Sequence, residues 1–456
     1  MKKKSLLLIL VVLVQFSVFS QVTKIYDLSA SSGKEPLGGL ITDGTFLYGM
    51  TQWGGSNNKG VVFKIKPDGT NYTILYSFDN TNGEEPHGSL ILLNDFLYGT
   101  TIKGGTKNNG VIFKIKTDGT NFNKIFSFDD ASVAEIITDG TSLYGVSSSG
   151  DNNSTNGGQV GFVFKITTEG TGFSIIHQFQ GTEGSVPQGK LLLINQYLYG
   201  VTSYGPTGSN GGIIYKVKTD GTGFSSVYSP EQGALNSIIT DGVYFYCTTD
   251  FGGNPSGDGS IIKVKLDGTS FSMLKDFDYD NGSEPSGNLF IQNSELYGMT
   301  NSGGNNGYGV LYKINTDGTG YTILYHCVAM SNGNKGTNPR GGYVAINNNL
   351  YGMFQLGGIN YVGSIFKYQL TTTSVKEVNS NLKVSVFPNP ASDYITIQSD
   401  YVFVKYSVIN NLGQIILTGQ DLYDNKINVS SLKSGDYVFI FSTKDNKKSS
   451  VNIAVK

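Results

Sequence analysis

Short apolar runs separated by glycine-containing turns recur along most of the chain. Residues 39–49, GLITDGTFLYG, return as residues 88–99, GSLILLNDFLYG. The tyrosine of this Leu-Tyr-Gly signature recurs seven times at intervals of 46 to 55 residues, and only the fifth copy departs from it, as Phe-Tyr-Cys. The seven tyrosines are Tyr48, Tyr98, Tyr144, Tyr199, Tyr246, Tyr297 and Tyr351. Self-similarity at a fixed period predicts a repeat protein.

Each copy divides into four strand-like pieces, which in the second copy are residues 90–93, 96–100, 111–116 and 122–128. They are rich in aromatic and β-branched residues and have no helical period, which predicts β-strands. Asp-Gly pairs such as Asp43-Gly44 and Asp118-Gly119 separate the pieces and predict hairpins with type I′ turns, in which both central residues have positive φ. Calcium binding is an alternative role for these aspartates. Each turn offers a single carboxylate, however, whereas calcium needs several oxygen ligands, so plain turns are favoured.

Four-stranded units of this period are typical of propeller blades. The seventh copy has only its first three pieces, whereas residues 24–28 near the N-terminus align with the fourth piece of the other copies. We therefore expect the N-terminal strand to complete the last blade and close the ring. The predicted fold is all-β: a seven-bladed β-propeller over residues 21–370, followed by a small C-terminal β-sandwich.

The N-terminus has the features of an export signal. Three lysines at positions 2–4 precede an apolar core over residues 6–14, and Val18 and Ser20 are small enough for cleavage before Gln21. The core is too short to cross a bilayer, which takes about 20 residues. No cysteine follows it that would anchor a lipoprotein, and no other stretch is expected to span a membrane. The prediction is a signal peptide over residues 1–20 and a secreted protein.

Composition and charge agree with an all-β protein and exclude two classes of partner. Glycine (61), tyrosine (28) and phenylalanine (26) are abundant, and only 15% of residues are charged. Residues 21–379 carry 22 basic and 29 acidic side chains without a basic stripe. Binding to nucleic acid or to an anionic membrane depends on basic side chains, so neither is expected as a partner.

The sequence offers little material for a disulfide or a metal site. Cys247 and Cys327 belong to different repeats, and a disulfide needs Cα atoms within about 7 Å, so we expect two unbonded, half-buried thiols. The three histidines, His87, His177 and His326, have no ligand spacing. No metal and no cofactor are predicted.

Three motifs point to a repeat family. They are the Leu-Tyr-Gly signature, a Gly-Gly pair that follows it, as at residues 54–55 and 104–105, and Phe-Lys-Ile, as at residues 63–65 and 113–115. Residues 24–368 resemble the glo_ver family of tandem repeats found in bacterial surface proteins. The resemblance implies export and display, and it implies no particular activity. The lysines of Phe-Lys-Ile are expected to extend between blades or to the surface.

A second resemblance covers the C-terminus. After a polar linker at residues 371–381, residues 382–456 alternate apolar and polar positions, as expected for the sandwich. Residues 387–391 (FPNPA), 412–414 (LGQ) and 435–437 (GDY) resemble the type A C-terminal sorting domain of the type IX secretion system. This implies transport across the outer membrane of a Bacteroidetes-type cell. A surface sortase would then remove the domain and attach the body to lipopolysaccharide or release it. A carbohydrate-binding sandwich is the alternative.

The predicted long loops carry the first set of candidate site residues. The second-to-third and fourth-to-first connections are long and share one face, and function concentrates on long loops held by a rigid scaffold. Trp53, Tyr204 and Phe251 lie there at neighbouring positions of different repeats and could stack on sugar rings. The alternative is that each ring packs over its own Gly-Gly loop.

A second set lies where the first strands begin. Glu35, Glu85 and Glu284 each precede a proline, and we expect them to ring the channel mouth together with His87 and Arg340. Two carboxylates at the right distance would allow glycosidic cleavage. The fixed repeat position also has a structural explanation, because the proline sets the turn and the carboxylate can accept backbone N–H groups.

No nucleophile motif accompanies these residues, since the chain has three histidines and no Gly-x-Ser-x-Gly. The leading interpretation is a non-enzymatic surface propeller that binds glycan or protein, with no catalytic residues assigned. The first alternative is a hydrolase or lyase that acts on polysaccharide through Glu35, Glu85 or Glu284. The second alternative is a purely structural surface component.

Overall fold

The computed structural model describes residues 22–129, 133–149, 160–206, 211–230, 233–252, 257–328, 335–370, 384–409, 415–420, 422, 425–432, 434–444 and 448–456. The described chain is all-β, and its helical structure is limited to 3-10 turns such as η2 (Tyr279–Asn281). It divides into two compact units, residues 1–370 and 371–456. None of its helices is long and apolar enough to cross a membrane. The predicted signal peptide and linker lie outside the described residues.

The first unit consists of antiparallel four-stranded sheets whose strands follow chain order. The first sheet contains β2 (Ile41–Thr42), β3 (Leu47–Thr51), β4 (Val61–Ile65) and β5 (Thr73–Ser77). The second contains β6 (Glu84–Leu93), β7 (Phe96–Lys103), β8 (Val111–Lys116) and β9 (Asn123–Ser127). The third contains β10 (Val133–Thr138), β11 (Ser142–Ser147), β12 (Phe162–Thr167) and β13 (Ser174–Gln178).

The following sheets repeat this order. The fourth contains β14 (Ser185–Ile194), β15 (Tyr197–Tyr204), β16 (Ile214–Lys218) and β17 (Ser225–Tyr228). The fifth contains β18 (Leu235–Thr240), β19 (Tyr244–Thr249), β20 (Ser260–Lys265) and β21 (Ser272–Asp276). Next come β22 (Ser283–Gln292), β23 (Glu295–Ser302), β24 (Val310–Asn315) and β25 (Thr322–His326). The last three strands of the unit are β26 (Thr337–Ile346), β27 (Asn349–Leu356) and β28 (Ser364–Gln369).

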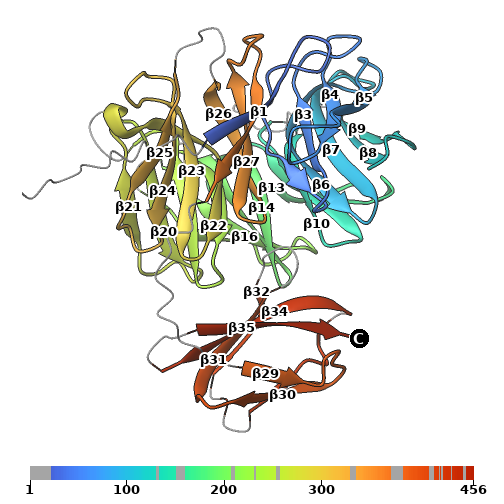
Figure 1. The fold of residues 1–456 in the computed structure, drawn as a ribbon. Helices are drawn as coiled ribbons and strands as arrows, with labels where there is room; N and C mark the ends of the chain where they lie inside the picture. The colour runs from blue at the N-terminus through green and yellow to red at the C-terminus, as the bar shows by residue number, and fades with distance from the viewer. Residues whose placement is uncertain are drawn as a thin grey trace, which may run out of the picture. The chain divides into compact units, whose positions relative to one another are not determined.

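The N-terminal strand β1 (Val22–Asp27) pairs antiparallel with β28, which in turn pairs with β27. In Figure 1 the blue strand β1 lies beside the orange strands of the last repeat. Two segments from opposite ends of the unit thus share one sheet, and the predicted pairing of the N-terminal strand is confirmed. A parallel bridge between Asn288 and Gly342 connects this sheet to the preceding one. Every sheet contacts the next in chain order, and β26 also contacts β2 of the first sheet.

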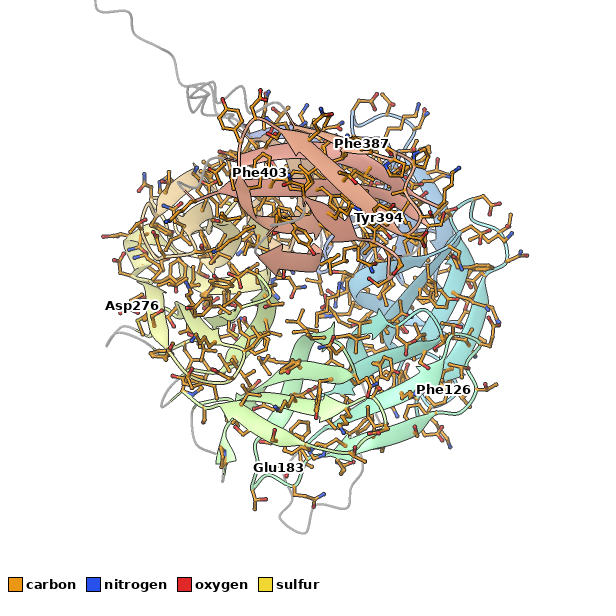
Figure 2. The ribbon with its side chains drawn as sticks, turned by 90° about the horizontal axis from the view of Figure 1, so that it is seen from below. Phe126, Glu183, Asp276, Phe387, Tyr394 and Phe403 are labelled. Atoms are coloured by element: carbon orange, nitrogen blue, oxygen red, sulfur yellow. The ribbon has the colours of Figure 1, made fainter. Side chains whose placement is uncertain are left out.

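The sheets therefore surround a common centre, with the first strand of each innermost and the fourth outermost. Phe126 on β9 and Asp276 on β21 mark the outer edge in Figure 2. Apolar side chains fill the space between neighbouring sheets. In one such layer, Tyr98 and Ile112 of the second sheet pack with Ile136, Leu143 and Phe164 of the third. The repeat pattern thus builds a core between consecutive copies.

The Leu-Tyr-Gly signature is explained by pairing within each sheet. Gly49 lies opposite Phe63 of Phe-Lys-Ile, and Gly99 lies opposite Phe113. A Cβ atom on Gly49 would lie 2.6 Å from Cζ of Phe63, so the phenylalanine ring needs glycine at this position. The two motifs are therefore halves of one packing unit.

The innermost strands approach one another closely through glycine backbone. A Cβ atom on Gly38 would lie 1.6 Å from the carbonyl oxygen of Gly88 in the next sheet, and one on Gly341 would lie 2.2 Å from the carbonyl carbon of Gly38. Backbone cannot move aside as a flexible side chain can. The glycine after each proline therefore allows three successive sheets to meet at the centre.

The predicted hairpins are present, but the turn type is wrong. In the turns at Asp43-Gly44 and Asp118-Gly119, only the glycine has positive φ, at 90° in both cases. Oδ1 of Asp118 accepts a hydrogen bond of 2.8 Å from the N–H group of Thr120. This Asx contact satisfies the turn while the aspartate keeps negative φ, so no type I′ turn forms.

The first strands are longer than predicted. Strand β6 begins at Glu84, whereas the sequence predicted residues 90–93 for this strand with a long loop before it, and β22 likewise begins early, at Ser283. The extra residues pair with correspondingly longer second strands, with Pro86 opposite Thr101 and Pro285 opposite Thr300. The proline positions are therefore strand positions interrupted by a bulge.

Cys247 and Cys327 are unbonded, as expected, but both are fully buried rather than half-buried. Each lies in an apolar layer between neighbouring sheets.

The second unit contains two sheets. One has the order β29 (Val384–Phe387), β30 (Tyr394–Ser399) and β33 (Lys426–Asn428). The other has the order β32 (Ile415–Gln420), β31 (Phe403–Ile409), β34 (Gly435–Thr443) and β35 (Lys448–Val455). Side chains from both, including Ile395, Val408 and Phe439, form one buried core. The LGQ motif at residues 412–414 lies outside the described residues.

Candidate functional site

The three candidate aromatic residues occupy equivalent places in three sheets. Each follows its signature tyrosine by five residues, at or just after the end of the second strand. Tyr204 is 42% exposed and Phe251 is 43% exposed, whereas Trp53 is half-buried and its backbone pairs with Lys34. Among the described residues no ring contact joins these side chains. They are therefore separate points on one rim and form no continuous aromatic patch.

The three candidate glutamates share an unusual backbone conformation. Glu35, Glu85 and Glu284 have φ of 57°, 55° and 54°, which is rare for residues other than glycine. Their N–H groups donate to the preceding sheet, for example from Glu85 to the carbonyl of Lys59 and from Glu284 to that of Asp258. Val186 and Asn338 precede the corresponding prolines and have the same conformation, with φ of 57° and 51°. The strained position is thus part of the repeat and does not require an acid.

The carboxylates of Glu85 and Glu284 accept hydrogen bonds from side chains. Nζ of Lys103 lies 2.6 Å from Oε1 of Glu85, which is 4% exposed, and Nε2 of Gln52 donates to Oε2 over 3.2 Å. Glu284 accepts from Nδ2 of Asn301 at 2.9 Å and from Oγ of Ser302 at 3.2 Å. Backbone N–H groups were a possible set of donors to these carboxylates, but these four donors are side chains: Lys103, Asn301 and Ser302 come from the second strand of the same sheet, and Gln52 comes from the preceding sheet.

His87 and Arg340 come together near the centre with an acid that the sequence did not single out. Burial lowers the pKa of His87, the charge of Arg340 lowers it further, and the charges of Glu135 and Glu85 act in the opposite direction. The imidazole is therefore neutral at pH 7. Its Nδ1 atom and Nε of Arg340 are buried without a hydrogen-bond partner.

Asp250 is a second acid that was missed. Burial raises its pKa, a hydrogen bond from Asn236 lowers it, and the charges of Glu284 and Arg340 act on it in opposite directions. Arg340 is thus an electrostatic neighbour of both His87 and Asp250, which belong to different sheets. Charged groups from several repeats therefore lie within electrostatic reach of one another near the centre.

Glu135 connects three sheets. Its Oε1 atom accepts a hydrogen bond of 3.2 Å from Oγ of Ser89 on β6, and Nδ2 of Asn288 on β22 lies 3.4 Å from its Oε2 atom. Asn288 is 153 residues away in the chain. An alignment of the first strands of the repeats contains the signal for Glu135. It places Glu135 at the same repeat position as Ser89 and Asn288, and Glu135 is the acidic residue at that position.

The turn aspartates have structural partners. Oδ2 of Asp139 accepts a hydrogen bond of 2.8 Å from the hydroxyl of the signature Tyr144, and its Oδ1 atom accepts from the N–H group of Ser142. Asp43 and Asp241 do the same with Tyr48 and Tyr246. No three His, Cys, Asp or Glu side chains within the described ranges are grouped to hold a metal ion.

The lysines of Phe-Lys-Ile, and Lys263 at the equivalent position in Ile-Lys-Val, extend between sheets, which is one of the two directions predicted for them. Nζ of Lys64 donates to the carbonyl of Thr117 in the next sheet over 3.0 Å, and Nζ of Lys263 donates to that of Thr316 over 2.8 Å. Nζ of Lys114 lies 2.6 Å from Oε2 of Glu169 in the next sheet. These lysines connect neighbouring repeats and are not candidates for ligand binding.

Comparisons with known proteins bear on both units. The family model of the Gloeobacter/Verrucomicrobia repeat matches residues 12–157 and 233–400. The model of the secretion system C-terminal sorting domain matches residues 385–456. No curated protein matches the sequence.

Among solved structures, an oligogalacturonate lyase in complex with manganese is similar at a TM-score of 0.53 and 12% identity, over 77% of this chain and 93% of the lyase. A puromycin-hydrolyzing peptidase of Mycobacterium tuberculosis is similar at a TM-score of 0.51 and 10% identity, over 91% of this chain and 60% of the peptidase. Similarity at this level of identity shows a propeller-like fold and carries no activity to this chain.

Proposed function

The chain belongs to the Gloeobacter/Verrucomicrobia repeat family, and on this premise we propose that it is an exported seven-bladed β-propeller that binds glycan or protein without catalysing a reaction. Its type IX sorting domain implies secretion by that system and a surface or extracellular location. Removal of the domain by a surface sortase and attachment of the body to lipopolysaccharide in a Bacteroidetes-type cell belong to the proposal.

Four observations support the seven-bladed ring. The signature tyrosine recurs seven times, the sheets contact each other in chain order, and β26 contacts β2 where the chain returns to its start. Pairing of β1 with β28 supplies the fourth strand that the last repeat lacks. The shared core of the two C-terminal sheets supports a sandwich for the sorting domain.

The observation that carries a binding role is the exposure of equivalent aromatic side chains at one rim. Tyr204 and Phe251 each leave more than 40% of their surface in solvent; Tyr204 is the last residue of β15, and Phe251 lies two residues after the end of β19. Aromatic rings that are held rigid supply large contact area at a low cost in conformational entropy. Trp53 completes the proposed set with a half-buried ring.

A glycan array tests this proposal, using the full chain and the double variant Tyr204→Ala, Phe251→Ala. We expect saturable binding to at least one glycan and a loss of about tenfold or more in the variant. Phe271→Ala is the matched control, because Phe271 is 45% exposed and follows the Asp267-Gly268 turn, at the opposite ends of the strands. Binding that survives in the double variant would remove the rim from the proposal.

An enzyme that acts on polysaccharide, as hydrolase or lyase, is the second candidate, and one observation favours it. Burial and the charge of Glu284 raise the pKa of the Asp250 carboxyl, and a raised pKa is a property of carboxyl groups that act as general acids. Against it, Glu85 is paired with Lys103, and Glu284 accepts hydrogen bonds from two side chains.

The similar lyase was solved with manganese. Within the described residues of this chain, no three His, Cys, Asp or Glu side chains are grouped to hold a metal ion, so the enzymatic candidate includes no step that uses a metal. Incubation with polysaccharides and measurement of new reducing ends tests the enzymatic candidate. Products that disappear in Asp250→Asn would establish it, and unchanged polysaccharide would exclude it for the substrates used.

A further inference from the structure

One row of residues occupies equivalent positions on or just before the first strands, which are the innermost strands of the sheets. Its members lie two positions before the residue that pairs with each signature tyrosine, as Glu135 does before Ile137 opposite Tyr144. The row consists of Gly39, Ser89, Glu135, Lys190, Ser237, Asn288 and Gly342. The contacts of Glu135 with Ser89 and with Asn288 join three of the innermost strands near the common centre of the sheets. Figure 2 views this arrangement of sheets from below.

Two cations near this row lack an ion pair within the described part of the chain. They are Arg340, whose Nε atom is buried without a partner, and Lys190, which is half-buried on β14. The Nδ1 atom of the neutral His87 is also buried without a partner. Buried polar groups are nearly always hydrogen-bonded in native proteins, so Nε of Arg340 and Nδ1 of His87 call for a partner that the described chain does not supply.

The acids around Arg340, by contrast, each have a donor. Glu85 is paired with Lys103, Glu135 accepts from Ser89, and Asp250 accepts from Asn236. Glu284 accepts from Asn301. The charged side chain that lacks a partner near the centre is therefore a cation, Arg340, although acids outnumber bases there. A planar guanidinium binds a carboxylate through two parallel hydrogen bonds, which makes Arg340 a suitable anchor for one.

We propose that Arg340, His87, Lys190 and Glu135, the axial cluster, bind a sugar residue that carries a carboxylate. The carboxylate would pair with Arg340, and the ring hydroxyls would donate to Glu135 and accept from Lys190 or His87, since a hydroxyl can do both. This deepens the proposed function, on which it rests, by naming acidic glycans as the ligand class. The aromatic rim would hold the remainder of the chain.

Calorimetric titration of the full chain tests the proposal, with oligosaccharides of a uronic acid and of the corresponding neutral sugar as probes. We expect the acidic oligosaccharide to bind more tightly, and Arg340→Gln to weaken its binding by about tenfold or more while leaving the neutral one unchanged. Added salt should weaken only the acidic one. Lys107→Gln is the matched control, because it removes an exposed charge outside the cluster.

Equal affinity for both probes, or unchanged affinity in a folded Arg340→Gln variant, would overturn the axial cluster while the propeller's general binding role stands. Failure to bind any glycan would overturn both proposals. If Arg340→Gln does not fold, Arg340→Lys and Lys190→Gln provide the comparison, because the first keeps the charge without the planar fork. Unchanged selectivity in both of these would likewise contradict the proposal.

Discussion

Glu135 and Asn288 lie on strands β10 and β22, 153 residues apart, yet Nδ2 of Asn288 is 3.4 Å from Oε2 of Glu135. The same carboxylate accepts a hydrogen bond from Ser89 on β6. One side chain therefore connects three sheets near the centre of the ring. Ser89 belongs to the neighbouring repeat, whereas Asn288 comes from a distant one, so the contact with Asn288 forms only when the sheets have come together around their common centre.

Glu135→Ala should lower the free energy of unfolding by about 1 kcal/mol, since it removes one hydrogen bond and one longer polar contact. Chemical denaturation of the full chain measures this. A double-mutant cycle with Asn288→Ala should give a coupling of about 0.5 kcal/mol. Strictly additive effects would show that the two residues do not interact in solution.

The Asp139–Tyr144 contact should make stability depend on pH at acidic values. Burial acts to raise the pKa of Asp139, but hydrogen bonds from Ser142, Thr141 and Tyr144 outweigh it and lower the pKa from its ordinary 3.8 to about 2. The ionised carboxylate therefore stabilises the fold at pH above about 4, and this contribution is lost as pH falls toward 2.

Asp139→Asn should accordingly destabilise the protein at pH 7 by about 1 kcal/mol or less, because the carboxylate is largely open to solvent. The difference from the unsubstituted protein should shrink between pH 4 and pH 2, measured by urea denaturation across that range. A difference that stays constant would mean that the carboxylate charge is not what stabilises the turn. Tyr144→Phe removes one of its donors and should lose less.

Gly38→Ala should cost more than about 3 kcal/mol or prevent folding, because the added Cβ would lie 1.6 Å from the carbonyl oxygen of Gly88. Gly44→Ala is the matched control. Gly44 has φ of 90° but no atom within 4 Å of an added Cβ, so only conformational strain of about 1 kcal/mol is expected. Thermal unfolding of the two variants measures the difference. Equal costs would contradict close packing at the centre.

Both cysteine thiols should be unreactive in the folded protein. Burial raises the pKa of Cys247 and of Cys327 far above the usual range for a thiol, and the thiolate is the reactive form. A thiol reagent such as dithionitrobenzoate should therefore label neither residue until denaturant is added, and then label both. Rapid labelling of one thiol without denaturant would place that residue at the surface.

The sequence by itself determined the strands, the hairpins, the repeat and the pairing of the N-terminal strand with the last repeat, because these depend on local pattern and on a period. Residues 111–116, for example, were predicted as a strand and are β8. The sequence also predicted that the Asp-Gly pairs form turns, but it did not predict the turn type. The carboxylate of Asp118 accepts a hydrogen bond from the N–H group of Thr120, and only Gly119 of this pair has positive φ.

Only the tertiary structure decided which side chains meet at the centre. His87 and Arg340 could be predicted as neighbours because they share a repeat position, but Glu135 sits in a repeat without the Pro-x-Gly pattern and was missed. Backbone N–H groups were one possible set of partners for Glu85, whereas its carboxylate is paired with Lys103, because the first strand extends past the proline and lies beside the strand that carries this lysine. Such contacts depend on how far each strand extends and on closure of the ring, and neither property is encoded in a single repeat.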